Sequence, residues 1–453
     1  MTNTQVSTTL FSSFAYKPTT CQAKALYLLE EFLDNPAKQK VFMLKGSAGT
    51  GKTTLMQALV SYLADSAFHI ELLAPTGKAT KVLTKRSKSL ATTIHHLLYL
   101  PVELEDGRIF YHYRPNLCKI RTVYVVDEAS MLPSVATNDG LFFAENALLN
   151  DLLRHAEEGH PDNQIIFVGD TYQLEPIGET ESVALSEQLF RKKFDLHVAS
   201  TMLQEVMRQA TGSPIIGLAN RVKDLKDKDL PLKSQFLPLP RLRSESEAVH
   251  YFMTFFEAPQ PENVIFLALS NEKVHHLNQT VREQIGVSAL PLAKGDLVYL
   301  DATWSNSAHH IVRGETGLVV GVGGKVEVRA NLRFIEAEIA FRNMNNEWFK
   351  VQAHLMLDYL TAEKPMIAQE QMKYLKADRM SNNKTYRSTE RASDDPYMSA
   401  MRLRYGYALT GHKAQGSEWE RVLIDPRFHL GNGHRWLYTA ITRAKEEVWS
   451  WWY

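Results

Sequence analysis

One segment of eight residues constrains the fold of this 453-residue chain more than any other. It lies between the apolar run Val41–Leu44 and the helical pattern Thr53–Ala64, in the strand, loop and helix order that a phosphate-binding loop requires. Its glycines let backbone N–H groups face the phosphates of a nucleotide, its lysine supplies a cation, and its final threonine offers a hydroxyl to Mg²⁺. We therefore predict that a nucleotide is held by the eight residues Gly46, Ser47, Ala48, Gly49, Thr50, Gly51, Lys52 and Thr53, together with the following Thr54.

Short apolar runs rich in β-branched residues recur along the chain and end in Gly, Pro, Asp or Ser, as buried parallel strands do. They are Val41–Leu44, Ile70–Ala74, Val123–Val126, Ile165–Val168, Val264–Leu269 and Val422–Ile424. Helical patterns such as Gln22–Leu33 separate many of these runs, which favours right-handed βαβ units. Because the chain is also too long for one compact core, we predict an α/β protein with two doubly wound parallel sheets.

Two insertions interrupt this alternation. The first, Leu100–Tyr113, is predicted to form a β-hairpin because strand-like runs flank the turn pair Asp106-Gly107. The second, Pro291–Ala400, begins with short strand-like runs. The glycines that punctuate those runs are Gly295, Gly314, Gly317 and Gly321. Its later part, Pro365–Pro396, is polar and charged, which indicates exposed helices or a mobile arm.

Two further strand ends carry polar residues that an ATPase uses. Val123–Val126 leads into Asp127-Glu128, where Asp127 is expected to act on Mg²⁺ and Glu128 to serve as the general base. Ile165–Val168 leads into a polar segment in which Gln173 is the candidate for sensing the γ-phosphate or orienting water. Taken alone, the acidic pair could cap a helix and Gln173 could lie in a polar turn. The phosphate loop upstream favours the ATPase interpretation.

Composition limits the other possibilities. Lys plus Arg and Asp plus Glu number 51 each, so any nucleic-acid site must be a local groove. Cys21 and Cys118 cannot form a disulfide framework or a four-thiolate zinc site, and we expect both to be buried. The chain has no long apolar run and no secretory signal, so we expect a soluble, cytoplasmic protein without a membrane partner.

One stretch has five cations and no acidic residue, which suits a phosphate-tracking surface or a solvated helix face. Those cations are Lys78, Lys81, Lys85, Arg86 and Lys88.

Seven strings occur in the order of the conserved motifs of superfamily 1 helicases, and the resemblance covers most of the chain. Besides the segments at Asp127 and Gly169, they are Ala74–Ala79, Thr93–His95, Leu203–Gln209, Tyr407–Glu418 and Tyr438–Ala444. The forms Ala-Pro-Thr-Gly-Lys-Ala and Gly-Asp-x-x-Gln-Leu-x-Pro are similar to the RecD, Dda and Pif-like branch. The resemblance implies an ATP-dependent helicase that moves 5′ to 3′ on single-stranded DNA and unwinds forked or tailed duplex DNA. A translocase that does not separate strands, or an ATP-dependent DNA-binding scaffold, stays open as an alternative.

The resemblance also implies roles for residues outside the phosphate loop. Arg208 and Arg443 would be arginine fingers at the γ-phosphate, although either could be a surface ion-pair residue. Glu418 would bind the ribose. Gln22 would read the adenine, unless it is an ordinary residue of a first helical turn.

A groove for single-stranded DNA follows from the same resemblance. Hydroxyls, backbone N–H groups and a few cations suffice to hold phosphates without reading sequence. The residues that would line it are Thr76, Lys78, His95, Thr410, His412 and Lys413. Phe110 and Tyr111 of the hairpin would stack on the last base pair, although a hairpin that packs its aromatic rings inward is an alternative. The two histidines could also be hydrogen-bonded structural residues.

The domain organisation implied by the resemblance has four parts. Residues 1–97 and 114–203 would form a RecA-like domain 1A, with residues 98–113 as a strand-separating insertion 1B. Residues 204–290 and 401–453 would form a second RecA-like domain, 2A. Residues 291–400 would form insertion 2B, an SH3-like β domain followed by a polar arm. We expect a protein that is active as a monomer, and the sequence does not say which proteins it binds.

Overall fold

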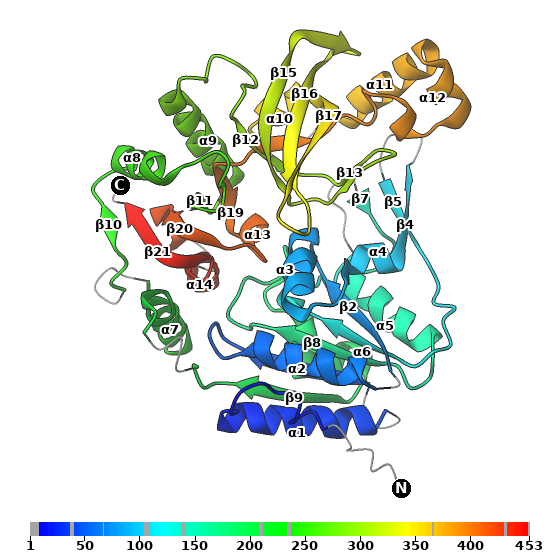
Figure 1. Ribbon diagram of the computed structural model, residues 1–453, viewed down its shortest axis with the longest axis vertical. Coiled ribbons are helices and arrows are strands. Elements are labelled where there is room, and N and C mark those ends of the chain that lie inside the picture. The colour runs from blue at the N-terminus through cyan, green and yellow to red at the C-terminus, as the bar shows by residue number, and fades with distance from the viewer. Residues whose placement is uncertain are drawn as a thin grey trace, which may run out of the picture. The chain divides into compact units, whose positions relative to one another are not determined.

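The computed structural model divides into two compact units (Figure 1). It describes residues 9–36, 40–66, 68–103, 109–136, 142–207, 212–232, 237–364, 367–429 and 433–451. The first unit comprises the described parts of Met1–Val102 and Ile109–Gly217, and the second those of Glu103–Arg108 and Leu218–Tyr453. Helix α7 (Pro214–Asp227) contains the residue at which the division falls.

A six-stranded parallel sheet forms the centre of the first unit. Its strand order is β3-β2-β6-β8-β1-β9, and every adjacent pair is parallel. The strands are β1 (Val41–Gly46), β2 (His69–Ala74), β3 (Ala91–Thr93), β6 (Thr122–Val126), β8 (Gln164–Gly169) and β9 (Val198–Leu203). The four strands predicted in this part of the chain are therefore confirmed.

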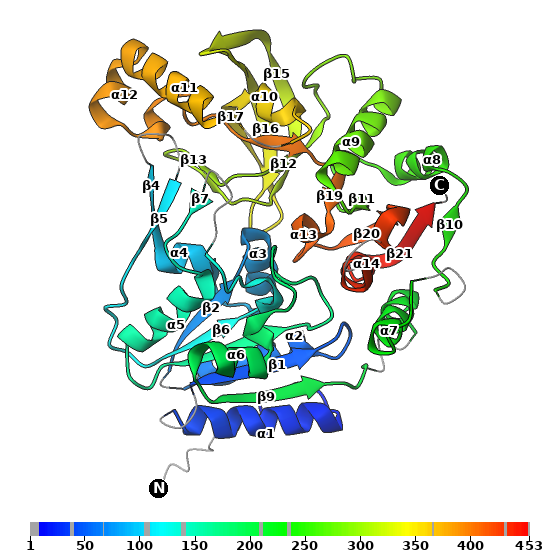
Figure 2. The same cartoon turned by 180° about the vertical axis from the view of Figure 1, so that it is seen from behind.

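Helices cover both faces of this sheet (Figures 1 and 2). Phe42 and Leu44 of β1 pack with α1, α2 and α3, whereas Val41 and Met43 pack on the opposite side with α4, α5 and α6. The helices are α1 (Thr20–Asp34), α2 (Lys52–Ala64), α3 (Gly77–Ser87), α4 (Ile94–Leu98), α5 (Leu148–Glu158) and α6 (Glu187–Phe194), with the 3-10 helices η1 (Ala129–Met131) and η2 (Val183–Leu185). Because successive strand residues alternate between two apolar layers, the strand reads as a continuous apolar run, as the sequence showed.

A smaller sheet of three strands follows α4 in the chain. It has the order β4-β5-β7, and β5 pairs in parallel with β7. The strands are β4 (Tyr99–Glu103), β5 (Ile109–Tyr113) and β7 (Phe142–Phe143). The turn pair Asp106-Gly107 of the predicted hairpin lies outside the described residues.

The second unit contains a five-stranded parallel sheet with the order β10-β21-β20-β11-β19. Its strands are β10 (Arg241–Leu242), β11 (Val264–Ala268), β19 (Ala408–Thr410), β20 (Trp419–Ile424) and β21 (Ala444–Trp451). The helices that go with it are α8 (Glu245–Phe255), α9 (Asn271–Ile285), α13 (Gly411–Ala414) and α14 (Gly433–Ile441), with the 3-10 helix η4 (Pro426–His429). Strands β11 and β20 confirm the two remaining predicted strands, and with them the prediction of two parallel sheets.

An antiparallel sheet is inserted between β11 and β19 of the second unit, in the order β17-β16-β15-β12-β18. Its strands are β12 (Leu297–Leu300), β15 (Thr316–Arg329), β16 (Leu332–Arg342), β17 (Trp348–Met356) and β18 (Leu403–Tyr405), beside the short pair β13 (Trp304–Ser305) and β14 (His310–Ile311). Short runs broken by glycines were predicted here, and that prediction is wrong for β15. This strand continues through Gly317 and Gly321 because register shifts after Val319 and Val322 absorb the irregularity.

The polar segment after β17 is helical. It forms α10 (Leu357–Thr361), α11 (Gln369–Asn382) and α12 (Lys384–Thr389), followed by the 3-10 helix η3 (Ala392–Asp394). Tyr386 and Leu375 of these helices pack in one apolar cluster with Phe334 of β16. Of the two structures that composition suggested for this segment, the described residues therefore show helices.

The two sheets of the second unit share one apolar core. Phe266 of β11 and Ile339 of β16 belong to the same cluster. A buried ion pair joins the two parts: the Arg282 guanidinium in α9 donates to both Asp296 carboxylate oxygens, with N···O distances of 3.0 and 3.1 Å. The Tyr407 hydroxyl donates to Asp296 Oδ1 at 2.9 Å. Since charges are rarely buried without partners, this network ties the start of β12 in the antiparallel sheet to α9 and to Tyr407.

Two expectations from composition can be compared with the structure. Cys118 is exposed and Cys21 is half-buried, so the prediction that both cysteines are buried is wrong. Cys118 lies in an irregular loop before β6, where its N–H donates to Asn116 Oδ1. Among the described helices, none is both long and apolar enough to cross a bilayer.

Removal of the Asp296 carboxylate should destabilise the second unit. Asp296→Ala leaves the Arg282 guanidinium buried without its counter-charge, so we expect the free energy of unfolding to fall by about 3–5 kcal/mol. All seven tryptophans lie at or after Trp304, so urea unfolding followed by tryptophan fluorescence reports on this unit. Glu338→Ala, which breaks the exposed 3.3 Å ion pair with Lys350, is the control and should cost less than about 1 kcal/mol. Equal losses in the two variants would contradict the structural role of the buried pair.

Candidate nucleotide site

The predicted phosphate loop connects β1 to α2. Gly49 and Gly51 have φ angles of +78° and +85°, a region that costs a residue with a side chain free energy. A Cβ atom at Gly46 would lie 2.6 Å from Thr50 Oγ1. Only glycine therefore fits these positions without strain, and the loop curls tightly over the end of β1. Thr53 and Thr54 lie in the first turn of α2.

The ammonium group of Lys52 lies over this loop. Its Nζ donates to the carbonyl oxygens of Gly46 and Ser47 at 2.6 and 3.0 Å, and it lies 4.0 Å from Asp170 Oδ2. Ser47 Oγ is buried, and no hydrogen-bond partner for it occurs in the described parts of the chain. A cation beside an unsatisfied hydroxyl and a glycine-rich turn suits a polyphosphate group.

Asp127 and Glu128 directly follow β6, which lies beside β8 and β2 in the sheet. The Asp127 N–H donates to Leu73 O at 2.9 Å, which ties the strand end to β2. Burial raises the pKa of Asp127. A backbone hydrogen bond lowers this pKa, as do the charges of Lys52 and Arg86, but together they offset only part of the effect of burial. A bound divalent cation would favour the ionised form of such a carboxyl group.

Glu128 has a left-handed backbone, with φ +52° and ψ +38°. This conformation costs a non-glycine residue about 1–2 kcal/mol. Strained residues of this kind gather at functional sites, where the surrounding structure holds them. The surrounding structure therefore holds Glu128 in this conformation directly after β6.

Gln173 lies in the segment that follows β8. Its N–H donates to Asp170 O at 3.2 Å. Gln173 Oε1 and Ser130 Oγ are buried and, among the described residues, have no hydrogen-bond partner. Native interiors leave few polar groups unsatisfied, so these two atoms and Ser47 Oγ mark this edge of the sheet as a place for a polar ligand.

Gln22 lies in the first turn of α1 and contacts the phosphate loop. Its Oε1 accepts from the Thr19 N–H at 3.0 Å in a capping box, and its Nε2 donates to Thr50 O at 3.1 Å. Nε2 also lies 3.1 Å from Met207 Sδ. Gln22 is fully buried. It is a first-turn helix residue, as one of the two alternatives had it, and it also contacts the phosphate loop. Its reading of the adenine stays a prediction.

Sequence reasoning missed the residues that follow β9. The Met207 N–H donates to Gly49 O at 2.9 Å, and Glu205 Oε1 accepts from the Cys21 N–H at 2.9 Å. These contacts arise because β9 pairs with β1, with Leu203 opposite Gly46. The chain that leaves β9 therefore passes the phosphate loop. Only the likeness of this segment to a helicase motif could have indicated its position.

The predicted arginine fingers and ribose ligand have different outcomes. Arg208 lies outside the described residues. Arg443 is buried in the second unit, where its guanidinium donates to the carbonyl oxygens of Thr439 and Ser417 at 3.1 and 3.2 Å. Glu418, the residue after Ser417, is exposed. The structure thus brings Arg443 and Glu418 close together at the start of β20.

The predicted DNA-binding residues fall into two groups. In the first unit, Thr76 caps α3 by accepting from the Ala79 N–H at 3.2 Å, and Lys78 lies in the first turn of that helix. In the second unit, Thr410 caps α13, and His412 and Lys413 lie in its single turn. The Lys413 ammonium lies 2.9 Å from Asp301 Oδ2, at the end of β12.

Two tyrosine rings lie near the ring of His95. The ring centres of Tyr111 and Tyr99 lie 5.4 and 5.8 Å from that of His95. Phe110 packs against Phe143 of β7 with a centroid distance of 5.1 Å. Both candidate stacking residues of the insertion therefore make ring contacts within the first unit and are half-buried.

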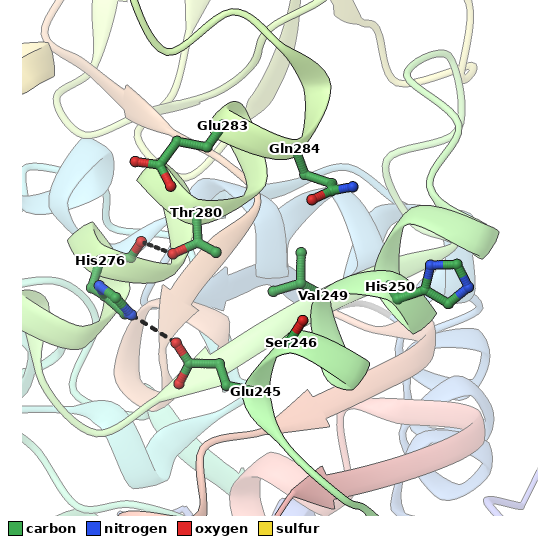
Figure 3. A pocket seen from close by; sticks show the side chains of 8 residues that line it. All are labelled: Glu245, Ser246, Val249, His250, His276, Thr280, Glu283 and Gln284. Atoms are coloured by element: carbon green, nitrogen blue, oxygen red, sulfur yellow. Dashed lines mark hydrogen bonds and ion pairs between the residues drawn. The ribbon is translucent and has the colours of Figure 1, made fainter.

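A concavity of about 480 Å³ lies between α8 and α9 (Figure 3). Glu245 lines it and accepts from His276 Nε2 at 2.7 Å, while Lys273 forms an ion pair with the same carboxylate. Burial would raise the pKa of Glu245, but Lys273 and His276 outweigh that effect and hold the pKa below its usual value. In the described ranges, no group of three or more His, Cys, Asp or Glu side chains is arranged to hold a metal ion. The Glu245 carboxylate thus has two cationic partners, and the concavity has no glycine-rich loop of the kind that holds a phosphate.

Comparison with known proteins agrees with this geometry. Residues 28–231 match the family model of an AAA domain, and residues 405–449 match that of a UvrD-like helicase C-terminal domain. The ATP-dependent DNA helicase Dda of Enterobacteria phage T4 is 25% identical over 440 residues, which cover 89% of this chain and 93% of Dda. The ATP-dependent RecD2 DNA helicase of Deinococcus radiodurans is 26% identical over 427 residues, which cover 92% of this chain and 48% of RecD2.

Solved structures give the same relation at the level of the fold. A Pif1 helicase structure from work on unwinding at forked duplex DNA by two coordinating Pif1 helicases aligns with a TM-score of 0.50 and 16% identity. The alignment covers 96% of this chain and 92% of that one. A mixed α/β fold with RecA-like parallel sheets is therefore shared. With the two domain matches and the relatives Dda and RecD2, the chain belongs to the Pif1/RecD-like family of superfamily 1 helicases.

Proposed function

We propose that the protein is an ATP-dependent DNA helicase that moves 5′ to 3′ along single-stranded DNA and unwinds forked or tailed duplexes. The observation that carries the proposal is the edge of the first parallel sheet. There Lys52 lies over a glycine-rich loop, 4.0 Å from Asp170, beside the strand end that bears Asp127 and Glu128. Full-length similarity to Dda, a DNA helicase, supports the choice of substrate.

Each residue of the predicted nucleotide site has a proposed task. Lys52 and the loop N–H groups bind the phosphates, and Glu128 accepts the proton of the attacking water. Gln173 orients that water, Gln22 contacts the adenine, and Glu418 the ribose. Arg208 and Arg443 are proposed to stabilise the charge that develops on the γ-phosphate. Mg²⁺, held by Thr53 and Asp127, would supply the charge neutralisation that phosphoryl transfer requires.

The DNA-contacting surface is likewise a proposal. Thr76, Lys78 and His95 in the first unit, and Thr410 and His412 in the second, are proposed to hold the sugar-phosphate backbone. The strands β4 and β5 are proposed to form the strand-separating hairpin of a 1B insertion. The antiparallel sheet is proposed to be the SH3-like part of a 2B insertion, within the four-domain organisation given above. We propose a monomer as the active species.

Two alternatives make different predictions. A translocase would hydrolyse ATP on single-stranded DNA without opening a duplex. A DNA-binding scaffold would bind ATP without hydrolysing it. The scaffold is disfavoured because Lys52, Asp127, Glu128 and Gln173 are all present, whereas a protein that only binds nucleotide needs no general base.

Strand separation should depend on the polarity of the single-stranded tail. With ATP and Mg²⁺, we expect a duplex with a 5′ tail to be unwound, while a duplex with a 3′ tail and a blunt duplex stay paired. Fluorescence from a dye and quencher placed on opposite strands measures this directly. Unwinding of the 3′-tailed duplex alone would overturn the proposed direction. Hydrolysis without unwinding of either substrate would favour the translocase.

Loss of the proposed catalytic groups should separate hydrolysis from DNA binding. Glu128→Gln removes a general base, so phosphate release stimulated by single-stranded DNA should fall by about 10²–10⁴-fold. Lys52→Ala should abolish it, since the phosphates lose their cation. Fluorescence anisotropy should show that both variants still bind single-stranded DNA. Lys350→Ala, an exposed lysine on β17, is the control and should behave as the wild type. Wild-type turnover in either site variant would refute the assignment.

The backbone strain at Glu128 gives a second test. Both Glu128→Gly and Glu128→Ala should lose ATP hydrolysis, but the glycine variant should be more stable by about 1 kcal/mol because glycine tolerates a left-handed backbone. At Glu31, an exposed position within α1, glycine should instead be less stable than alanine by about 0.5–1 kcal/mol. Thermal unfolding followed by circular dichroism measures both pairs. If the glycine variant were less stable than the alanine variant at both positions, the backbone of Glu128 would not be strained.

A further inference from the structure

Lys413 has a buried partner inside the second unit. It lies in α13, three residues after Thr410, and its Nζ lies 2.9 Å from Asp301 Oδ2. The ammonium is also 5.4 Å from the centre of the Tyr299 ring. The Lys413 side chain is 21% exposed and that of Asp301 only 3% exposed. The cation of this helicase motif therefore points into the protein, toward the end of β12.

Asp301 is surrounded by groups from several elements. The Tyr359 hydroxyl of α10 donates to its Oδ2 at 3.1 Å, and Arg313 lies 3.6 Å from its Oδ1. Arg404 of β18 is held nearby by the carbonyl oxygens of Tyr359 and Ala362. One carboxylate thus balances two cations, Lys413 and Arg313, at a junction of the antiparallel sheet with the parallel one.

The charges of this junction depend on one another. Burial would raise the pKa of Asp301, but the charges of Lys413 and Arg313 outweigh it and hold the pKa below its ordinary value. Burial lowers the pKa of Lys413, and Asp301 opposes that effect. If the ammonium turned toward a DNA phosphate, a nearly buried carboxylate would lose its best partner. The geometry therefore opposes a phosphate contact for Lys413.

A second ion pair holds the other end of the same strand. Arg282 of α9 is paired with Asp296, the residue before β12, and Asp301 is the residue after it. Arg282 lies in α9, which follows β11, and Lys413 lies in α13, which follows β19. Each ion pair therefore joins one of these two helices to one end of β12. An apolar core runs between them. Strand β12 is thereby fastened at both ends to the layer that carries Thr410 and His412.

We propose that Lys413 is a positioning residue that locks the Thr410–Ala414 turn to the antiparallel sheet, rather than a contact to DNA. This proposal rests on the proposed helicase function. Through the Asp301 pair, a movement of the turn during the ATP cycle is transmitted to the inserted sheet. Without the pair, ATP hydrolysis continues but is less well coupled to strand separation.

The test compares Lys413→Met, Asp301→Asn and the double variant with the wild type, below the unfolding temperature of each. The first readout is the slope of log Kd for single-stranded DNA against log salt concentration. Loss of one phosphate contact reduces the magnitude of this slope by about 0.7. We expect no such change in Lys413→Met, and we expect it in Lys78→Met, the matched lysine in the first turn of α3. A reduced slope in Lys413→Met with an unchanged slope in Asp301→Asn would overturn the proposal.

The second readout is the number of base pairs opened per ATP hydrolysed. We expect it to fall by about five- to tenfold in each single variant and no further in the double variant, because both substitutions remove the same link. Loss of stability with an unchanged ratio would show a merely structural pair and overturn the proposal, as would additive effects. If a single variant does not fold, the double variant, which buries neither charge, must still show the reduced ratio. A wild-type protein that does not bind single-stranded DNA would instead overturn the proposed function.

Discussion

The common direction of all six strands in the first sheet is the constraint on which the candidate site depends. Parallel strands end at one edge, so the ends of β1, β6 and β8 deliver the phosphate loop, Asp127 and Asp170 to neighbouring positions. The order β6-β8-β1 makes these strands direct neighbours although they are far apart in the chain. Burial of both sheet faces by helices then holds the strand ends rigidly, because alternate residues of each strand pack into separate apolar cores.

Local sequence patterns predicted the parts of this arrangement that local physics determines. Apolar runs gave the strands of both parallel sheets, and glycines followed by Lys52 gave the loop, since its positive φ angles require glycine. Contacts that depend on strand pairing had no local signal. Met207 contacts Gly49 only because β9 lies beside β1, and the sequence alone does not state which strand occupies that edge.

The antiparallel sheet shows a different limit of sequence reasoning. Glycines within β15 suggested turns, but Gly317 allows close approach instead, since a Cβ atom there would lie 2.8 Å from the side chains of Ile339 and Phe341. The charged residues Arg282 and Lys413 likewise gave no sign of burial. Their carboxylate partners lie 14 and 112 residues away in the chain, and a lysine within a helicase motif is more readily interpreted as a ligand contact. Pairing geometry, rather than residue type, separates the two roles.

Buried polar groups distinguish the two kinds of site in this protein. Around Asp296 the charges are satisfied by Arg282, by the Tyr407 hydroxyl and by the Ala293 N–H, so the cluster stabilises the fold. At the edge that carries Lys52, Ser47 Oγ and Gln173 Oε1 have no hydrogen-bond partner in the described part of the chain, and the Glu128 backbone is strained. Such features cost a folded chain stability unless another group compensates them. A phosphate group and its cation supply hydrogen-bond partners and charge at that edge, so the features that weaken it locally are those that make nucleotide binding favourable.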